Sequence, residues 1–383
     1  MKKILFSVAM AFVLVSCAHD EVIEINRDGD EIQFNVVSDA ATRAADVYCN
    51  NNLPGEFNVW ATYKGATYID GDLIKKESNA WVNKTGVRYW PEDESVTFYA
   101  QVNAGDAFQW NDGAPTIKDY TVPTAVAEQK DLLYAVKSQG RSDNPVILNF
   151  RHALSQIVFQ ARNTNANLYV EIKGVTICKL GNVNTFTYTS DDTDNNIENH
   201  DGTTGTITYD DSWGTWATLN GGDTNYPVEF TAVPVPGDGK VKSLTNTNNT
   251  GKEFSSNAML LLPQSTTPWV PATDNGTPGN QDGTYFLVDC KICNVAGTSY
   301  NSATDVVLWN GNAAVPVKIN WEQGKKYIYT FVFGNGNGGY DPDPDPTPDP
   351  DPDPDPVLIP ITFEVTVDDF VPVANQNIAM ETK

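Results

Sequence analysis

Cys17 is the residue whose position most clearly predicts a covalent modification. Two lysines follow the first residue, Ile4–Val15 form an apolar run, and Leu14-Val15-Ser16-Cys17 has the pattern of a bacterial lipobox. The run is too short to span a bilayer, which takes ~20 residues, and it suits the apolar core of a secretory signal. The alternative is an ordinary signal with an incidental cysteine. We expect residues 1–16 to be removed and Cys17 to become the first, lipid-bearing residue.

Cys290-x-x-Cys293 is a candidate metal or redox pair. Metal binding takes two further ligands, and neither a second such pair nor a nearby histidine is present. A redox dithiol lies at the start of a helix that follows a strand, whereas these flanking residues predict a strand end and a turn. Together with Cys49 and Cys178 the pair allows two disulfides in an oxidising envelope, with three possible pairings. Structural disulfides and inert buried thiols both remain open.

The other candidate groups favour structural interpretations. His152 lies among apolar residues, which predicts a hydrogen-bonded structural histidine. The acidic loop Asp191–Asn196 could bind calcium, but it lacks the glycine and glutamate of an EF-hand, so we favour a solvated loop. The tryptophans are scattered along the chain, which favours sheet packing over a sugar-stacking platform.

Composition excludes nucleic acid as a partner. The 383 residues include 25 Lys and Arg against 49 Asp and Glu, a net charge of −24. A phosphate backbone needs a basic protein face, and this chain would repel it. Neither a G-x-S-x-G nucleophile elbow nor a P-loop is present. We therefore expect no enzymatic activity and no cofactor or metal.

The elements that must position these residues are predicted to be strands. Short runs of β-favouring residues recur with turn signals between them and no helical period, which is typical of β-sandwiches. We expect an all-β fold with an arm at 17–43 and sandwich domains at 44–149 and 150–336; His152–Ile157 is a brief helix-compatible stretch. The expected strands are Phe57–Tyr63, Val96–Val102, Asp131–Val136, Val146–Phe150, Val158–Ala161, Leu168–Leu180, Phe186–Tyr188, Thr206–Tyr209, Val228–Val233, Ala258–Leu262, Tyr285–Cys290, Val315–Ile319 and Tyr327–Phe333.

Two further strands share one pattern at opposite ends of the chain. The arm contains Ile32-x-Phe34-x-Val36, and the tail at 357–383 contains Ile361-x-Phe363-x-Val365-x-Val367. The match could be chance, because these are common buried strand residues. The alternative is that either strand can fill the same sheet edge, as in β-strand addition between molecules.

A spacer precedes the tail strand. The linker 337–356 begins with Gly-rich residues, and from 341 to 356 proline occupies every even position, mostly after Asp. The proline repeat prevents a helix or a strand ladder and can extend the chain by roughly 50 Å. A stiff, charged spacer resists folding back, so the tail strand is expected to favour another copy. Pairing with the second sandwich of its own chain is the alternative.

Arg43 lies between the arm strand and the body of the chain. Cleavage between Arg43 and Ala44 would release both the lipid and the strand with Ile32, Phe34 and Val36, leaving an apolar groove. Cleavage after Arg27 would spare that strand.

Several motifs together resemble one family. They are the lipobox, Thr42-Arg43-Ala44, Arg88-Tyr89-Trp90-Pro91 before the strand Val96–Tyr99, Asp131-Leu132-Leu133-Tyr134-Ala135, and Phe150-Arg151-His152-Ala153-Leu154-Ser155-Gln156-Ile157. The chain resembles the fimbrillin-like lipoproteins of Bacteroidales, which are subunits of type V pili. Asp20 and Glu21 also resemble the acidic surface-export signal of Bacteroidales lipoproteins.

The resemblance implies two transthyretin-like Greek-key sandwiches and a lipoprotein exported to the surface of the outer membrane. It further implies maturation by an Arg-specific protease at Arg43 and assembly with other pilus subunits by strand exchange, with 357–370 as donor candidate. The Asp-Pro spacer departs from an ordinary stalk subunit, so stalk, tip and anchor positions all stay open. The alternative function is a non-polymerising, lipid-anchored surface module that binds glycans or host ligands.

Overall fold

The computed structural model describes residues 31–38, 54–78, 80–93, 95–111, 113–141, 145–189, 214–244, 258–270, 282–295 and 299–334, and the backbone of 361–369. Within these ranges the only helices are two short 3-10 turns, η1 (Gly105–Ala107) and η2 (Val126–Glu128). The prediction of an all-β fold is thereby confirmed. No helix in the described part of the chain is long and apolar enough to cross a membrane.

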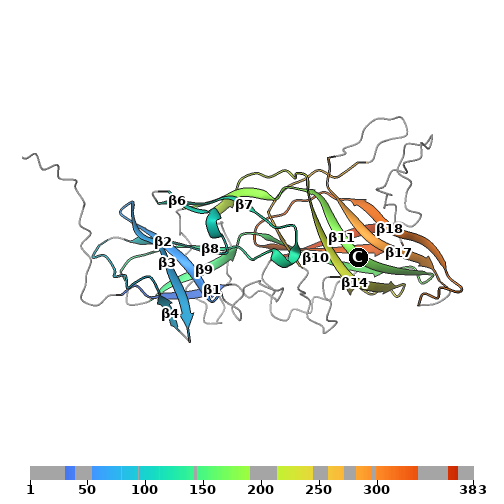
Figure 1. The fold of residues 1–383 in the computed structure, drawn as a ribbon, viewed down its shortest axis with the longest axis horizontal. Coiled ribbons are helices and arrows are strands. Elements are labelled where there is room, and N and C mark those ends of the chain that lie inside the picture. Colours follow the sequence, from blue (N-terminus) through green and yellow to red (C-terminus); the bar gives the residue numbers. More distant parts are fainter. Residues whose placement is uncertain are drawn as a thin grey trace, which may run out of the picture.

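A seven-stranded sheet carries the N-terminal strand at one edge (Figure 1). Its order is β1 (Phe34–Ser38), β9 (Val146–His152), β8 (Leu133–Gln139), β5 (Val96–Val102), β2 (Glu56–Tyr63), β3 (Ala66–Glu77) and β4 (Ala80–Asn83). Neighbouring strands run antiparallel except β1 and β9, which run parallel. The side chains of β5 alternate between two cores, because Phe98 and Ala100 pack in one while Tyr99 packs in the other.

Two further sheets form a sandwich in the second half of the chain. One contains β15 (Lys242–Ser243), β10 (Ser155–Asn163), β19 (Lys325–Phe333) and β20 (Ile361–Asp369), with β16 (Met259–Leu261) also paired to β10. The other contains β14 (Thr224–Pro236), β11 (Leu168–Leu180), β17 (Tyr285–Asn294) and β18 (Val306–Pro316). Phe159 of β10 and Phe286 of β17 meet between them, edge to face, with ring centroids 5.8 Å apart.

A fourth sheet joins strands from both halves of the chain. Its order is β13 (Gly214–Trp216), β12 (Val183–Tyr188), β7 (Ala114–Thr121) and β6 (Phe108–Asn111). Tyr188 of β12 packs against Tyr99 and Tyr134 of the seven-stranded sheet. Strands from either side of residue 150 therefore share one sheet and one core, and the proposed domain boundary there stays a prediction.

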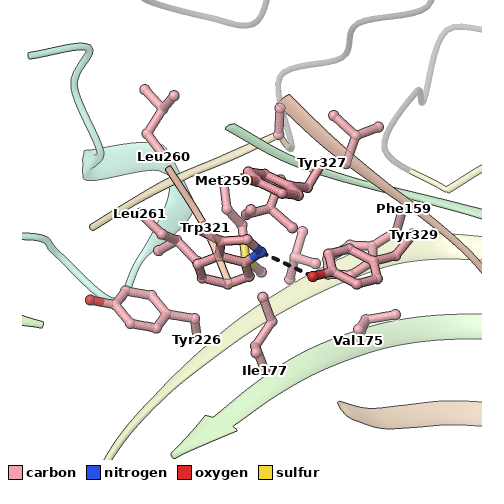
Figure 2. Close-up of a cluster of buried hydrophobic side chains, with 14 of the residues drawn as sticks. Phe159, Val175, Ile177, Tyr226, Met259, Leu260, Leu261, Trp321, Tyr327 and Tyr329 are labelled. Carbon is pink, nitrogen blue, oxygen red and sulfur yellow. Dashed lines mark hydrogen bonds between the residues drawn. The ribbon is translucent and has the colours of Figure 1, made fainter. Parts of the chain in front are cut away.

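Figure 2 shows the packing of buried side chains around Trp321 in the core of the second half of the chain. Its indole lies among Met259, Leu261 and Ile177, and its Nε1 donates a 2.9 Å hydrogen bond to the hydroxyl of Tyr329. Both aromatic side chains are nearly inaccessible to water. Because the Tyr329 hydroxyl oxygen accepts the indole N–H, this core holds a large tryptophan without leaving that donor unpaired.

Some predicted elements were wrong or incomplete. The helix-compatible stretch His152–Ile157 is not helical: β9 ends at His152 and β10 begins at Ser155. Residues of β10 are buried on both faces, which removes the alternation that marks a half-exposed strand. The strands β3, β4, β6, β7, β13 and β15 were not predicted, and the expected strand Val315–Ile319 covers only the last two residues of β18. The expected strand Thr206–Tyr209 lies outside the described residues.

Candidate functional site

The arm strand β1 lies in a slot between two segments of the chain. On one side it runs parallel to β9, with Phe34 opposite Val146, and the Val146 amide donates a 2.7 Å hydrogen bond to the Gln33 carbonyl. On the other side, the Ile32 amide donates a 2.8 Å hydrogen bond to the carbonyl of Arg88. The arm is therefore held at both backbone edges where it enters the sheet.

The three side chains predicted to mark the removable strand are buried. Ile32, Phe34 and Val36 keep only 4%, 6% and 4% of their surface exposed. The Phe34 ring meets the rings of Phe57 and Phe98 edge to face, at centroid distances of 6.4 and 5.7 Å. At ~1.5–3 kcal/mol each, the three side chains contribute roughly 5–9 kcal/mol as an upper estimate. The groove beneath β1 is thus a real apolar surface that this strand covers.

An ion pair between the partly exposed Arg88 and the buried Asp72 supports the second wall of the slot. The Arg88 guanidinium donates two 2.8 Å hydrogen bonds to the Asp72 carboxylate, one from Nε and one from the terminal nitrogen. Asn83 donates a third, at 2.7 Å, and the Asp72 side chain is fully buried. Burial raises the pKa of Asp72, but the hydrogen bonds from Arg88 and Asn83 outweigh it, so the pKa lies below its usual value. The network fixes the carbonyl that receives the arm.

Sequence reasoning missed this network. Arg88 stood in a motif quoted for the family resemblance, but Asp72 follows a glycine within a polar stretch that gave no strand signal. Trp90, two residues after Arg88, is 1% exposed and packs edge to face on Phe98, at 5.8 Å between centroids. The Arg88–Trp90 segment therefore contributes both a backbone acceptor and an apolar wall.

The tail strand β20 pairs with its own chain. It runs antiparallel to β19 along its whole length, with Phe363 opposite Phe331, Val365 opposite Tyr329 and Val367 opposite Tyr327. Ile361 lies opposite Phe333. The expectation that the spacer keeps the tail off its own body is wrong for this state, and the alternative of intramolecular pairing holds. The four expected donor positions thus lie at the edge of the five-stranded sheet.

The predicted processing sites lie outside the described residues. Cys17, Arg43 and Ala44 all fall there, as do the acidic residues that follow Cys17. In the sequence, Arg43 stands between Ser38, where β1 ends, and Glu56, where β2 begins. A cut at Arg43 would therefore leave β1 attached to the body by non-covalent contacts alone.

The three described cysteines are buried free thiols, which is one of the two expected alternatives. They are Cys178, Cys290 and Cys293, whereas Cys49 lies outside the described residues. The expected strand Tyr285–Cys290 is too short, because β17 continues through a bulge after Ile292 and ends at Asn294, within the flank where a strand end was expected. Burial raises the pKa of Cys178 to about 11 and that of Cys290 to about 12. Thiols that stay protonated at neutral pH are poor nucleophiles.

His152 has a structural role, as expected. Its Nδ1 lies 2.9 Å from the Asp131 carboxylate, and both side chains are buried. The pair joins the segment before β8 to the end of β9, so it braces the strand on which the arm lies. The acidic loop Asp191–Asn196 lies outside the described residues, and within those residues no three potential ligands gather as a metal site would require.

The described tryptophans serve packing. Trp60 stacks on Phe108 at 3.9 Å, while the indole N–H groups of Trp110 and Trp216 bond to Thr67 and to a backbone carbonyl. This arrangement agrees with the expectation of sheet packing.

Comparison with known proteins places the chain among related folds. A family described as fimbrillin-like matches residues 42–343. A solved fimbrial protein from Bacteroides vulgatus aligns over 89% of this chain and 100% of its own, at 14% identity and a TM-score of 0.56. A candidate cell adhesion protein from Bacteroides uniformis covers 90% and 99% of the two chains, at 14% identity and a TM-score of 0.42. No curated protein matches the sequence.

The match to the family spans well over half of the sequence and includes the strands that form the slot, apart from the arm itself. The likeness to the Bacteroides vulgatus structure shows that the fold is shared. The chain belongs to the fimbrillin-like family.

Proposed function

We propose that this protein is a structural and adhesive subunit of a cell-surface pilus, assembled by β-strand exchange. The precursor is exported as a lipoprotein through Cys17 and held at the outer membrane. An Arg-specific protease then cuts between Arg43 and Ala44. The observation that carries the proposal is the geometry of β1, an edge strand whose three buried side chains fill an apolar groove.

Strand exchange needs an incoming strand that satisfies the same groove. The tail repeats the apolar positions of the arm in the same chain direction, so Phe363 would take the place of Phe34 if the tail also runs parallel to β9. Four buried side chains at ~1.5–3 kcal/mol each provide roughly 6–12 kcal/mol, against the costs of association and ordering. The surplus supports exchange between copies.

The pairing of β20 with β19 adds one step to this scheme. The tail must leave its own sheet before it can enter the groove of another copy, so the isolated subunit stores its donor strand. An exchanged tail would regain a ladder with β9 in place of the one it gives up. Assembly then depends on the difference between two similar strand pairings, and cleavage at Arg43 provides the bias by making β1 free to leave.

Arg43 and Arg27 provide a matched pair for testing this scheme. Precursor is treated with an Arg-specific protease, and the products are analysed by N-terminal sequencing and on a heat-sensitive gel. We expect a new terminus at Ala44 and ladders of assembled subunits. Arg43→Ala should abolish the ladders, whereas Arg27→Ala should leave them unchanged, because a cut after Arg27 retains β1. Ladders that persist in Arg43→Ala would contradict the proposal.

The second candidate function is a lipid-anchored surface module that does not polymerise and binds glycans or host ligands. The pairing of β20 with its own β19 favours it, since a donor strand that stays bound is unavailable to other copies. The terminus of the mature protein on cells distinguishes the two functions. A start at Ala44 supports assembly, and a start at lipid-bearing Cys17 supports permanent anchoring.

A further inference from the structure

A hollow of about 530 Å³ opens in the second half of the chain, over the sheet formed by β14, β11, β17 and β18. Its volume lies in the range of small-molecule sites in proteins. Its polar lining comes from all four strands of the sheet, and apolar residues complete it. The lining residues that matter below are Lys173, Thr176, Glu229, Leu287, Asp289 and Asn312.

The hollow lies around Gly174, where a Cβ would approach the Val228 carbonyl oxygen to 3.1 Å, so the β14 backbone lies close to this glycine. Gly174 of β11 lies opposite Glu229 of β14 on one side and opposite Asp289 of β17 on the other. Asp289 in turn lies opposite Asn312 of β18. The strands lie ~4.8 Å apart, so the backbones that carry the two carboxylates are roughly 10 Å apart with only glycine between them. A bulge in β11 at Gly174 interrupts both ladders at this point.

The polar side chains around the gap are available to a ligand. Among the described residues, no hydrogen bond or ion pair occupies the side chain of Lys173, Thr176, Glu229, Asp289 or Asn312. Another hollow in the described residues, beside Trp216, is different, because the side-chain amides that line it are used internally. There Gln264 bonds to the Gly181 backbone, and Gln323 bonds to Tyr134 and to the Gly214 carbonyl.

We propose that this hollow, the Gly174 hollow, binds a neutral saccharide unit. Two carboxylates accept hydrogen bonds, Lys173 donates them, and Thr176 and Asn312 do both. Sugar hydroxyls also donate and accept, so they match this mixture, while Leu287 offers an apolar contact for a sugar C–H face. The paired carboxylates disfavour an anionic ligand, and Lys173 disfavours a simple cation.

The site adds a ligand class to the proposed adhesive role, and binding by a single copy does not depend on strand exchange. A shallow, water-exposed site of this kind is expected to bind one sugar weakly. If the chain polymerises as proposed above, repeated copies along a fibre would raise the apparent affinity for a multivalent glycan.

The test uses the full, uncut chain as a monomer, so that it gives an answer whether or not the protein assembles. Glucose, galactose and N-acetylglucosamine are titrated in turn, with glucuronate and glucosamine as charged counterparts. Binding is followed by saturation-transfer NMR and by backbone amide shifts. We expect saturable binding of at least one neutral sugar, with shifts centred on Lys173, Gly174 and Asp289.

Isosteric variants then locate the site. Glu229→Gln and Asp289→Asn each replace a charged acceptor with an amide and should weaken binding about tenfold. Glu128→Gln, which removes one charge from an exposed residue elsewhere, should leave binding unchanged. The proposal is overturned if no neutral sugar binds, if the charged sugars bind more tightly, or if the two hollow variants bind as the wild type does.

Discussion

Phe34 of the arm and Phe98 of the central strand β5 meet edge to face, with their ring centroids 5.7 Å apart. The contact joins a strand at the sheet edge to the centre of the first core. It explains how a short segment at the edge of the sheet is nevertheless well packed.

Removing the Phe34 ring should loosen the arm. Phe34→Ala deletes a buried aromatic side chain and leaves a cavity against Phe57 and Phe98, so we expect a loss of about 3 kcal/mol or more. Thermal unfolding of the uncut precursor and hydrogen exchange at β9 would measure it. Gln33→Ala, one position earlier and exposed, is the control and should change little. Equal stability of the two variants would argue against a filled groove.

The Asp72–Arg88 pair should make the slot sensitive to acid. The pKa of Asp72 is lowered in the folded protein, so the carboxylate stabilises the fold above its unfolded pKa, near 3.8. This contribution should be lost as the pH falls below that value through the folded pKa. Asp72→Asn leaves Arg88 without its charged partner and should destabilise the protein at neutral pH by about 1 kcal/mol, because the partly exposed guanidinium stays hydrated.

Denaturant unfolding at several pH values would test this prediction. The stability difference between the wild type and Asp72→Asn should be constant above about pH 5 and shrink below pH 4. A difference that grows on acidification would contradict the assigned direction of the pKa shift. Lys75→Ala, which breaks only an exposed ion pair with Glu56, should have a small effect at every pH.

The buried thiols should be unreactive in the folded protein. Burial raises the pKa of Cys178 to about 11 and that of Cys290 to about 12, so almost no thiolate exists at pH 8. Iodoacetamide should therefore label both residues slowly in native protein and fully in denaturant, as read by mass spectrometry. Rapid native labelling of Cys290 would show that β17 opens, against the packing described above.

The tail strand should be required for assembly and dispensable for the fold. Deleting Val357–Phe370 should leave a folded monomer that no longer polymerises after cleavage. Phe363→Asp should do the same, because a carboxylate cannot enter the Phe34 pocket without a large desolvation cost. Thr362→Asp, on the opposite strand face, is the matched control. Undiminished assembly by the deletion variant would exclude this tail as the donor.

Much of the fold was predictable where burial follows a simple pattern. The bounds of Val96–Val102 and Leu168–Leu180 were predicted correctly, since their apolar residues are dense enough to mark them. The strand β3 was missed because Gly71, with a φ of +77°, breaks its alternation and because Asp72 occupies a buried position. Its hairpin with β2 turns at Lys64 and Gly65, both at positive φ, a weak turn signal in sequence.

The candidate site was predictable in part. The burial of Ile32, Phe34 and Val36 followed from their alternation, because a period of two specifies which face packs. The partner strand did not follow, since β9 is more than a hundred residues away and its pairing depends on the whole sheet. The partner strand of β20 could not be predicted from the sequence either. Its pattern suits any apolar edge, and the sequence alone does not rank its own β19 against the groove of another copy.

The most direct test of strand exchange distinguishes the stored tail from the exchanged one by cross-linking. In its own chain Glu364 lies opposite Thr330, so a Thr330→Cys, Glu364→Cys double variant reports the stored pairing. In the exchanged state Glu364 would take the place of Asn35, which lies opposite Ile147. Copies with Ile147→Cys are therefore mixed with copies with Glu364→Cys, in a background with Cys49→Ser.

We expect the 147–364 disulfide to form between copies only after cleavage at Arg43, while the 330–364 disulfide forms within uncut monomers and blocks assembly. Assembled ladders that lack the 147–364 link, or that form despite the 330–364 link, would contradict the exchange of β1 for β20.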